Sequence, residues 1–214
     1  FDYNPVSNTL RVYDKLILNI SFPGGDAVLT NQLSEKYADV CFAGPVARLI
    51  NHEAFIHERD TASHYPIKMI IVADTMFHDA LQPFIAWKTK KGFIVDEAYT
   101  SNPAVGTTTI SISNYLQAKY DNATTADPAP TFILIVGDVA QIPAFSGTAG
   151  SHYTDMYYAE FTGDMIADAY FGRFSATNVD QLLPQIDKTL EYEQYLFPSE
   201  SWLDTVVMIA GADA

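Results

Sequence analysis

The residues best suited to chemistry by type and spacing lie in a short acidic stretch, residues 162–168 (TGDMIAD). Oxygen donors recur there at every second position: the side chains of Thr162, Asp164 and Asp168 and the backbone carbonyl of Ile166. A looped backbone can surround calcium in this way, because alternate residues point toward one centre. The stretch is not an EF-hand, since its glycine and its distal acid are in the wrong places. The alternative is a turn between two short strands, residues 157–161 and 170–174, and spacing alone favours the turn.

A further carboxylate, Asp138, follows the apolar run of residues 132–136 (FILIV). Such a run is typical of a strand that is buried on both faces of a parallel sheet. Ligands of these sheets bind just beyond the carboxyl ends of the strands, so Asp138 is the first position to consider for function. Together with residues 162–168 it is a candidate calcium ligand. The alternative is an aspartate that caps the following turn.

The sequence contains no convincing catalytic set. A nucleophile and its base could be drawn only from Cys41 and His152. Cys41 stands between valine and phenylalanine, the setting of a small buried hydrophobe, and His152 follows a loop rich in glycine, serine and threonine. The other histidines lack metal-ligand spacing. Neither a phosphate-binding loop nor a G-x-S-x-G elbow occurs.

Composition narrows the class of protein. The 214 residues include 48% hydrophobic residues, enough for one well-cored domain with a smaller appendage. A formal net charge of −14 argues against nucleic-acid binding, because nothing would neutralise phosphates. The single cysteine excludes an internal disulfide framework and a cysteine-cluster zinc site. No apolar run is long enough to span a membrane, and the absence of a signal peptide at Phe1 leads us to expect a longer precursor.

From residue 66 onward, strand and helix patterns alternate, which predicts an α/β fold with a parallel sheet covered by helices. We expect strands at 68–73, 93–95, 131–136 and 206–209, and helices at 77–91, 107–120 and 178–190. The middle helix is ambiguous, because part of it also alternates like a strand. Pro83 should lie in the first turn of its helix and Pro184 should kink the last one. Right-handed crossovers would place Asp74, Asp138 and Asp213 along one edge of the sheet.

Residues 1–58 have a different texture. Branched and aromatic residues at 10–22 end at a Pro-Gly-Gly turn, and asparagines flank an earlier turn near Pro5. These features predict a small β-rich segment, a hairpin or the edge of a β-sandwich. Residues 59–65 are polar and without periodicity, so they are expected to form a linker, and residues 66–214 form the α/β domain.

Motifs spread over the α/β part resemble the gingipain family of cysteine peptidases, most of all its lysine-specific members. They occur in unbroken order at residues 66–73 (PIKMIIVA), 81–93 (LQPFIAWKTKKGF), 105–108 (VGTT), 134–138 (LIVGD), 155–158 (DMYY), 172–175 (GRFS), 185–188 (QIDK) and 209–213 (IAGAD). The opening of the chain, residues 3–5 and 9–13, is similar to the end of that family's pro-domain.

The resemblance implies a fold and a division of labour. In the family, the catalytic domain has two caspase-like α/β subdomains, and the catalytic His and Cys lie in the second. This chain would then comprise the C-terminal part of a β-rich pro-domain (1–58), the linker (59–65) and the first subdomain (66–214). The catalytic pair would lie beyond Ala214, which would account for the missing catalytic set.

The resemblance also implies a calcium site, and each of its ligands can be matched to a position in this sequence. Asp138 matches the Asp of the Val-Gly-Asp motif, Asp164 a side-chain ligand and Ile166 a carbonyl ligand. Asp168 stands for a Glu that is one methylene longer, and Thr162 stands where the lysine-specific members have an Asp.

We therefore expect part of a secreted or cell-surface, calcium-binding cysteine endopeptidase that cleaves protein or peptide substrates after Lys or Arg. Its partner would be the second catalytic subdomain of the same precursor. No nucleic acid and no transmembrane segment are expected. The alternative is a non-catalytic relative: a pseudo-peptidase, a secretion-system component or a calcium-dependent binding module.

Overall fold

The computed structural model describes residues 2–12, 15, 17, 23–37, 41, 67–124, 126–147 and 152–199. The chain divides into two compact units, residues 1–35 and 36–214, and each is considered by itself. The expected linker at 59–65, the expected strand at 206–209 and Asp213 lie outside the described residues.

The first unit opens with an antiparallel hairpin of β1 (Asp2–Asn4) and β2 (Thr9–Arg11). The turn between them occurs where the asparagines predict it, and the side-chain oxygen of Asn4 accepts two backbone N–H groups within it. The sequence did not predict α1 (Ala27–Lys36), which Asp26 caps through two backbone N–H groups. The described apolar side chains of α1, Val28, Leu29 and Leu33, are exposed, so burial of an apolar face does not explain this helix.

The second unit alternates strands and helices along the chain. In order, the elements are β3 (Ile67–Ala73), η3 (Thr75–Phe77), α3 (His78–Lys90), β4 (Phe93–Tyr99), α4 (Thr109–Asp121), β5 (Pro130–Val136), β6 (Phe145–Ser146), β7 (Tyr153–Thr154), η4 (Met156–Tyr158), β8 (Tyr170–Phe174) and α5 (Val179–Gln194). The ambiguous middle segment is a helix. The short strand considered at 157–161 is wrong, because a 3-10 turn occupies its start.

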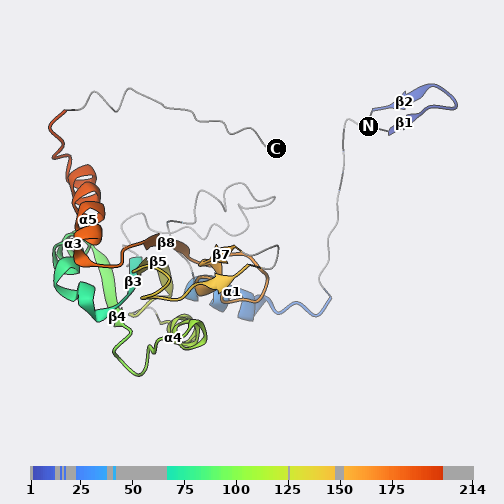
Figure 1. Ribbon diagram of the computed structural model, residues 1–214. Helices are drawn as coiled ribbons and strands as arrows, with labels where there is room; N and C mark the ends of the chain where they lie inside the picture. The colour runs from blue at the N-terminus through green and yellow to red at the C-terminus, as the bar shows by residue number, and fades with distance from the viewer. Residues whose placement is uncertain are drawn as a thin grey trace. The chain divides into compact units, whose positions relative to one another are not determined.

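Four parallel strands form the central sheet in the order β4-β3-β5-β8 (Figure 1). The register pairs Ala73 with both Tyr99 and Val136, and Val136 with Phe174, so the strands end together. We call this edge the carboxyl rim and the opposite edge, where the strands begin, the amino rim. Asp74 and Asp138 follow neighbouring strands at the carboxyl rim, as the crossover argument predicts.

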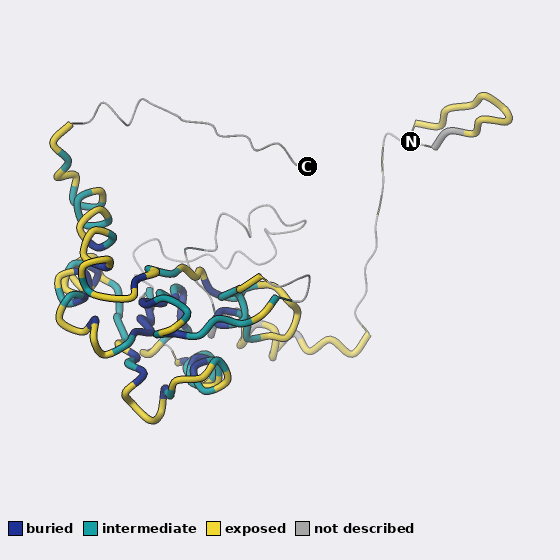
Figure 2. Tube along the Cα trace, in the orientation of Figure 1, coloured by how far each residue is buried: buried dark blue, intermediate teal, exposed yellow. Residues whose placement is uncertain are grey.

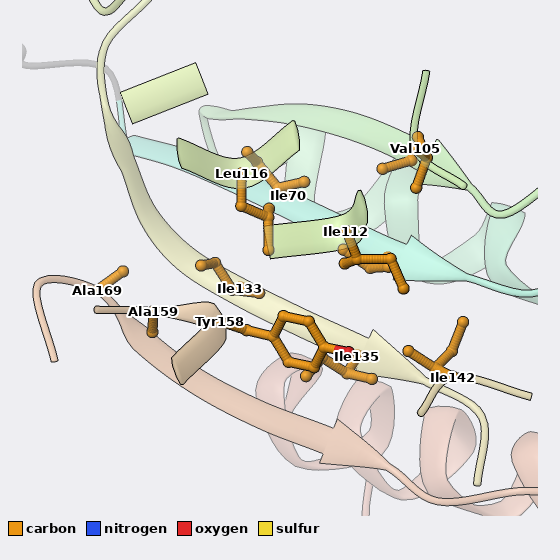
Figure 3. Close-up of a cluster of buried hydrophobic side chains, with 12 residues drawn as sticks. Ile70, Val105, Ile112, Leu116, Ile133, Ile135, Ile142, Tyr158, Ala159 and Ala169 are labelled. Atoms are coloured by element: carbon orange, nitrogen blue, oxygen red, sulfur yellow. The ribbon is translucent and has the colours of Figure 1, made fainter. Parts of the chain in front are cut away.

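Helices cover both faces of the sheet. On one face Ile112 and Leu116 of α4 pack on alternate residues of β3 and β5, with Tyr158 beside them (Figure 3). On the other face α3 and α5 pack on the intervening strand residues through side chains such as Leu81 and Leu182. Buried residues accordingly concentrate in the strands between the helices (Figure 2). The near-continuous apolar runs of β3 and β5 follow from this double coverage.

Side-chain caps begin the last two helices. Thr108 and Ser111 form a reciprocal capping box at α4, and Asn178 accepts the N–H of Gln181 at α5. Pro184 does not interrupt α5, which continues for ten residues beyond it.

Pro83 is not in the first turn of its helix, contrary to expectation. It lies in the second turn of α3, which begins at His78 directly after η3. Asp74 caps η3 by accepting the N–H of Met76 at 2.9 Å, so a 3-10 turn precedes the helix.

Candidate functional site

Asp138 organises the turn that follows β5. Its Oδ1 accepts the N–H of Val139 at 2.9 Å and the hydroxyl of Ser175 at 3.1 Å. Its backbone N–H donates to Ala176, so it also ties the ends of β5 and β8 together. The preceding Gly137 has φ +134°, and a Cβ there would come within 2.8 Å of the Gln141 side chain. Asp138 thus caps the turn after β5, which is the alternative role that the sequence left open.

Arg173 is the most heavily bonded side chain at the carboxyl rim. Its guanidinium donates to both carboxylate oxygens of Asp155 at 2.7 and 2.8 Å, and its Nη1 donates to the carbonyls of Gly137 and Ile142 at 2.8 and 2.9 Å. Both charged side chains are largely buried, with 13% and 17% of their surfaces exposed. This Arg173 clamp, a bidentate pair with two added carbonyls, fixes the segments on either side of the β6–β7 hairpin to β8.

Sequence reasoning gave neither Arg173 nor Asp155 a role. The signal that was available is that both belong to motifs on which the family resemblance rests, GRFS and DMYY. A further bond in the same region joins the buried Tyr158 hydroxyl to the Pro143 carbonyl at 2.6 Å.

The acidic stretch 162–168 forms a loop at the opposite edge, ahead of β8. Asp168 closes this loop: its Oδ2 accepts the N–H groups of Phe161 and Thr162 at 2.6 and 3.1 Å. The Thr162 hydroxyl lies 3.3 Å from both Asp168 carboxylate oxygens. The structure therefore brings Thr162 and Asp168 together, as the calcium pattern requires.

The other two expected ligands belong to the same loop. Asp164 Oδ1 accepts the N–H of Ile166 at 2.8 Å. Glu160, which the sequence analysis did not include, accepts the N–H groups of Gly163 and Asp164. The carboxylates of Glu160, Asp164 and Asp168 each accept hydrogen bonds from backbone N–H groups of the same loop. In the described part of the chain, no group of three or more His, Cys, Asp or Glu side chains comes together as metal ligands.

The loop packs against the C-terminal end of α4. Gln117 donates both to the Phe161 carbonyl at 3.2 Å and to Asp121 at 2.9 Å, which brings a further carboxylate toward the loop. The ring of Tyr120 stacks on that of Phe161. Burial, followed by the negative charge of Asp168, raises the pKa of the Tyr120 hydroxyl. Asp121 and Glu160 are thus acids near the loop that the sequence spacing could not reveal.

Asp138 is not brought to this loop, and this corrects the expected ligand set. Tyr170 pairs with Phe132 at the beginning of both strands, and Phe174 pairs with Val136 at their ends. Asp168 lies just before Tyr170, whereas Asp138 lies six residues beyond Phe132. The register therefore places the segment before β8 and the turn after β5 at opposite ends of the two strands. The physical reason is that parallel strands end together, so residues before β8 and after β5 lie at opposite rims.

A buried ion network lies near the amino rim. The Lys68 ammonium has no exposed surface and contacts Asp127 at 2.5 Å and Asp96 at 3.2 Å. Lys119 of α4 contacts the same Asp96 oxygen at 2.9 Å. Burial opposes ionisation of Asp96, but hydrogen bonds from Lys119 and Lys68 outweigh it and lower the pKa of that carboxyl. This Lys68 network joins β3, β4, α4 and the loop before β5.

A second carboxylate, Glu193, fastens α5 to α3. It accepts from the Trp87 indole at 2.8 Å, the Lys88 ammonium at 2.5 Å and the Lys91 ammonium at 3.0 Å. Burial opposes its ionisation, and the two lysines and the indole lower its pKa in spite of it. These groups hold α5 against α3, and Glu193 also lines a pocket together with residues such as Tyr192 and Phe197.

Cys41 and His152 occupy different parts of the structure. The Cys41 carbonyl accepts the Tyr170 hydroxyl at 3.1 Å, at the beginning of β8. His152 bonds through its backbone carbonyl to Gly147 beside the β6–β7 hairpin. His52, His57 and His64 lie outside the described residues.

Comparison with known proteins decides the family. The profile of peptidase family C25 matches residues 62–214. The chain belongs to peptidase family C25. Among relatives of this C25 chain, Lys-gingipain W83 from Porphyromonas gingivalis is 36% identical over 211 residues, and Gingipain R2 from the same organism is 26% identical over 217. Each alignment covers 99% of the chain, but only 12% and 28% of the relatives.

Solved structures agree with the C25 fold. One, described as the structure of a protease, superposes with a TM-score of 0.66 at 39% identity, over 71% of this chain and 33% of the other. A complex of pro- and mature domains of the P. gingivalis protein RgpB superposes with a TM-score of 0.53 at 25% identity, over 58% and 29%. The expected gingipain-like, caspase-like sheet is therefore confirmed. No helix in the described ranges is long and apolar enough to cross a membrane.

Proposed function

We propose that this chain supplies the first subdomain of a gingipain-type cysteine endopeptidase that cleaves after Lys or Arg. The observation that carries the proposal is the C25 match over residues 62–214, together with an alignment to Lys-gingipain along nearly the whole chain. The chain spans only 12% of that relative, so the activity of the complete protein is inferred from its family.

The chemistry of such a peptidase needs a thiolate to attack the peptide carbonyl and a histidine to act as base. We infer that sequence following residue 214 provides both groups. The described part contributes rigidity: the Arg173 clamp and the Asp138 turn hold the carboxyl rim, and two ion networks hold the helices to the sheet. A supporting scaffold of this kind keeps neighbouring catalytic elements in place.

The experiment is a cleavage assay with and without the following sequence. The purified 214-residue chain should not hydrolyse Lys- or Arg-containing peptides under reducing conditions. A chain extended by its natural downstream coding sequence should do so, and replacing its downstream cysteine with alanine should abolish the activity. Thiol-dependent cleavage by the 214-residue chain would contradict the proposal. A downstream sequence without His and Cys would favour a non-catalytic relative.

We also propose that the loop of residues 160–168 binds calcium. Its donors would be Thr162, Asp164, the Ile166 carbonyl and Asp168. Glu160 and Asp121 are nearby acids that could replace Asp138. Oxygen-rich loops with several carboxylates are the sites that calcium prefers. The donor chemistry fits calcium, and in the structure each of the three loop carboxylates accepts backbone N–H groups of the same loop.

Thermal unfolding with added calcium or with a chelator tests this site. If calcium binds, a hundredfold excess over the dissociation constant should stabilise the fold by about 2.7 kcal/mol. Asp164→Asn should reduce this calcium-dependent shift, and Asp138→Asn should leave it unchanged. A shift that Asp138→Asn removes would restore the ligand set expected from sequence, and no shift at all would exclude the site.

The cellular setting is proposed on the same family basis. We infer a secreted or cell-surface enzyme, made as a zymogen, whose partners are protein substrates and its own second subdomain. Residues 1–58 would be the end of its pro-domain.

A further inference from the structure

The basic residues of the α/β unit lie in its helices and strands. From residue 67 onward they are Lys68, Lys88, Lys90, Lys91, Lys119, Arg173 and Lys188. The structure places them in β3, α3, α4, β8 and α5, with Lys91 as the C-cap of α3. Helix propensity alone does not explain this distribution, because Lys68 and Arg173 are in strands.

The long connections between the main elements contain no basic residue. Residues 100–108, 122–129 and 137–169 have neither lysine nor arginine, although the last two ranges include aspartates. Exposed loops are the preferred places for proteolytic cleavage, whereas a bond inside a helix or strand is cut only when the element opens locally. An enzyme that requires Lys or Arg before the cut bond therefore finds no such residue in these connections.

Carboxylates also bind most of the basic head groups. Glu193 contacts the ammonium groups of Lys88 and Lys91, and Asp155 binds the guanidinium in the Arg173 clamp. The Lys68 network engages two further lysines. A peptidase that cleaves after Lys or Arg must bind the cationic head group itself, so a carboxylate that already holds this group competes with the peptidase.

Lys91 is the basic residue closest to a loop, and its side chain is 40% exposed. The bond that follows it is nevertheless part of the helix end, because the N–H of Gly92 donates to the Thr89 carbonyl at 2.9 Å. Its ammonium lies 3.0 Å from Glu193. Lys188 is exposed as well, but it lies inside α5. The backbone and the head group of Lys91 are thus both engaged.

We propose that this placement makes the α/β unit resistant to the activity of its own full-length protein, so that a peptidase specific for Lys or Arg does not hydrolyse its own scaffold. The proposal rests on the proposed function for the specificity of the enzyme. It goes beyond that function because it identifies a polypeptide that the enzyme spares and the structural reason for it.

The test exposes the folded 214-residue chain to trypsin, which cleaves after Lys and Arg and needs no downstream sequence. A fragment that contains residues 67–214 should persist, as identified by mass spectrometry. Met165→Lys places a lysine in the exposed acidic loop. It should be cut after residue 165 about tenfold faster than the wild-type chain is cut anywhere in 67–214. Met165→Gln is the matched control and should stay resistant.

A second variant tests the head groups. Glu193→Gln removes the charge that holds Lys91 and should raise cleavage after residue 91 about threefold. Fragment masses separate this effect from a general loss of structure, because an unfolded chain is cut at all of its basic residues. An unchanged rate after residue 91 would overturn the part of the proposal that concerns head groups.

Two results would overturn the proposal as a whole. One is cleavage of the wild-type chain within residues 67–214 as fast as that of Met165→Lys. The other is a Met165→Lys chain as resistant as Met165→Gln, because the loops would then resist cleavage whatever residues they contain. Neither result bears on the activity of the extended chain, which the cleavage assay above tests separately.

Discussion

The carboxyl rim and the acidic loop of residues 160–168 use their carboxylates in different ways. At the carboxyl rim, Asp155 is neutralised by Arg173, and Asp138 is occupied by its own turn and Ser175. In the acidic loop at the amino rim, the carboxylates of Glu160, Asp164 and Asp168 accept hydrogen bonds from uncharged backbone N–H groups. A carboxylate that already has a cationic partner gains little from a metal, whereas a carboxylate bonded only to uncharged groups keeps its attraction for a cation. The comparison teaches that the position of an acid relative to the strands matters as much as its spacing in sequence.

The largest effect is expected from breaking the Arg173 clamp. Arg173→Met leaves the largely buried Asp155 carboxylate and two carbonyls without their partner, and loss of one member of a buried pair costs about 3–5 kcal/mol. The free energy of unfolding from urea titration measures it. Arg173→Lys keeps the charge without the planar fork and should lose less. A loss below about 1 kcal/mol for Arg173→Met would show that the carboxyl rim does not depend on this pair.

The next effect concerns the Lys68 network. Lys68→Met removes the cation shared by Asp96 and Asp127, and should destabilise the fold by about 1.5–3 kcal/mol in the same titration. Lys119→Met is the matched control and should cost less, because Lys119 is 32% exposed and Asp96 keeps Lys68. Equal losses would mean that burial of the cation does not set its contribution.

Tyr158→Phe tests a neutral bond near the carboxyl rim. It removes the hydroxyl that donates to Pro143 and keeps the buried ring, so the loss should be about 0.5–1.5 kcal/mol. Phe145→Leu would instead remove ring contacts around Tyr158 and leave that bond in place. A Tyr158→Phe protein as stable as wild type would show that water replaces the lost donor.

The smallest effect is the acid response of the two ion networks. The pKa values of Asp96 and Glu193 are lower in the fold than their ordinary values of 3.8 and 4.5. The unfolded chain therefore binds protons first as pH falls, and the stabilisation present above about pH 5 is lost as pH drops through the folded pKa values. Unfolding titrations from pH 6 to pH 3 should show this loss, with a shallower slope for Asp96→Asn. An unchanged slope would remove Asp96 from the explanation.

More of the fold than of the candidate site could be predicted from the sequence. Buried apolar runs such as residues 132–136 and helical spacing are local signals, and they predicted strands β3 and β5 and helices α3, α4 and α5. The start of η3 depends on the cap at Asp74, and the described apolar side chains of α1, which was missed, are exposed. Local patterns could not place these boundaries.

The candidate site was only half predictable for a topological reason. Thr162 and Asp168 are close in sequence and meet in space, since one loop contains both. The position of Asp138 relative to the loop depends on the path of the chain between β5 and β8, and residue spacing does not reveal that path. Glu160 and Asp121 come near the loop through backbone bonds and the Gln117 side chain, which have no sequence signature.

The Arg173 clamp has a consequence for local unfolding. Arg173 belongs to β8, the last strand in the sheet order among the described residues, yet it holds the carbonyls of Gly137 and Ile142 far upstream. If β8 detaches, the turn after β5 loses its fastening at the same moment. We therefore expect the amide hydrogens of Ile142 and of β8 to exchange with solvent as one cooperative unit, although they are about thirty residues apart in the chain.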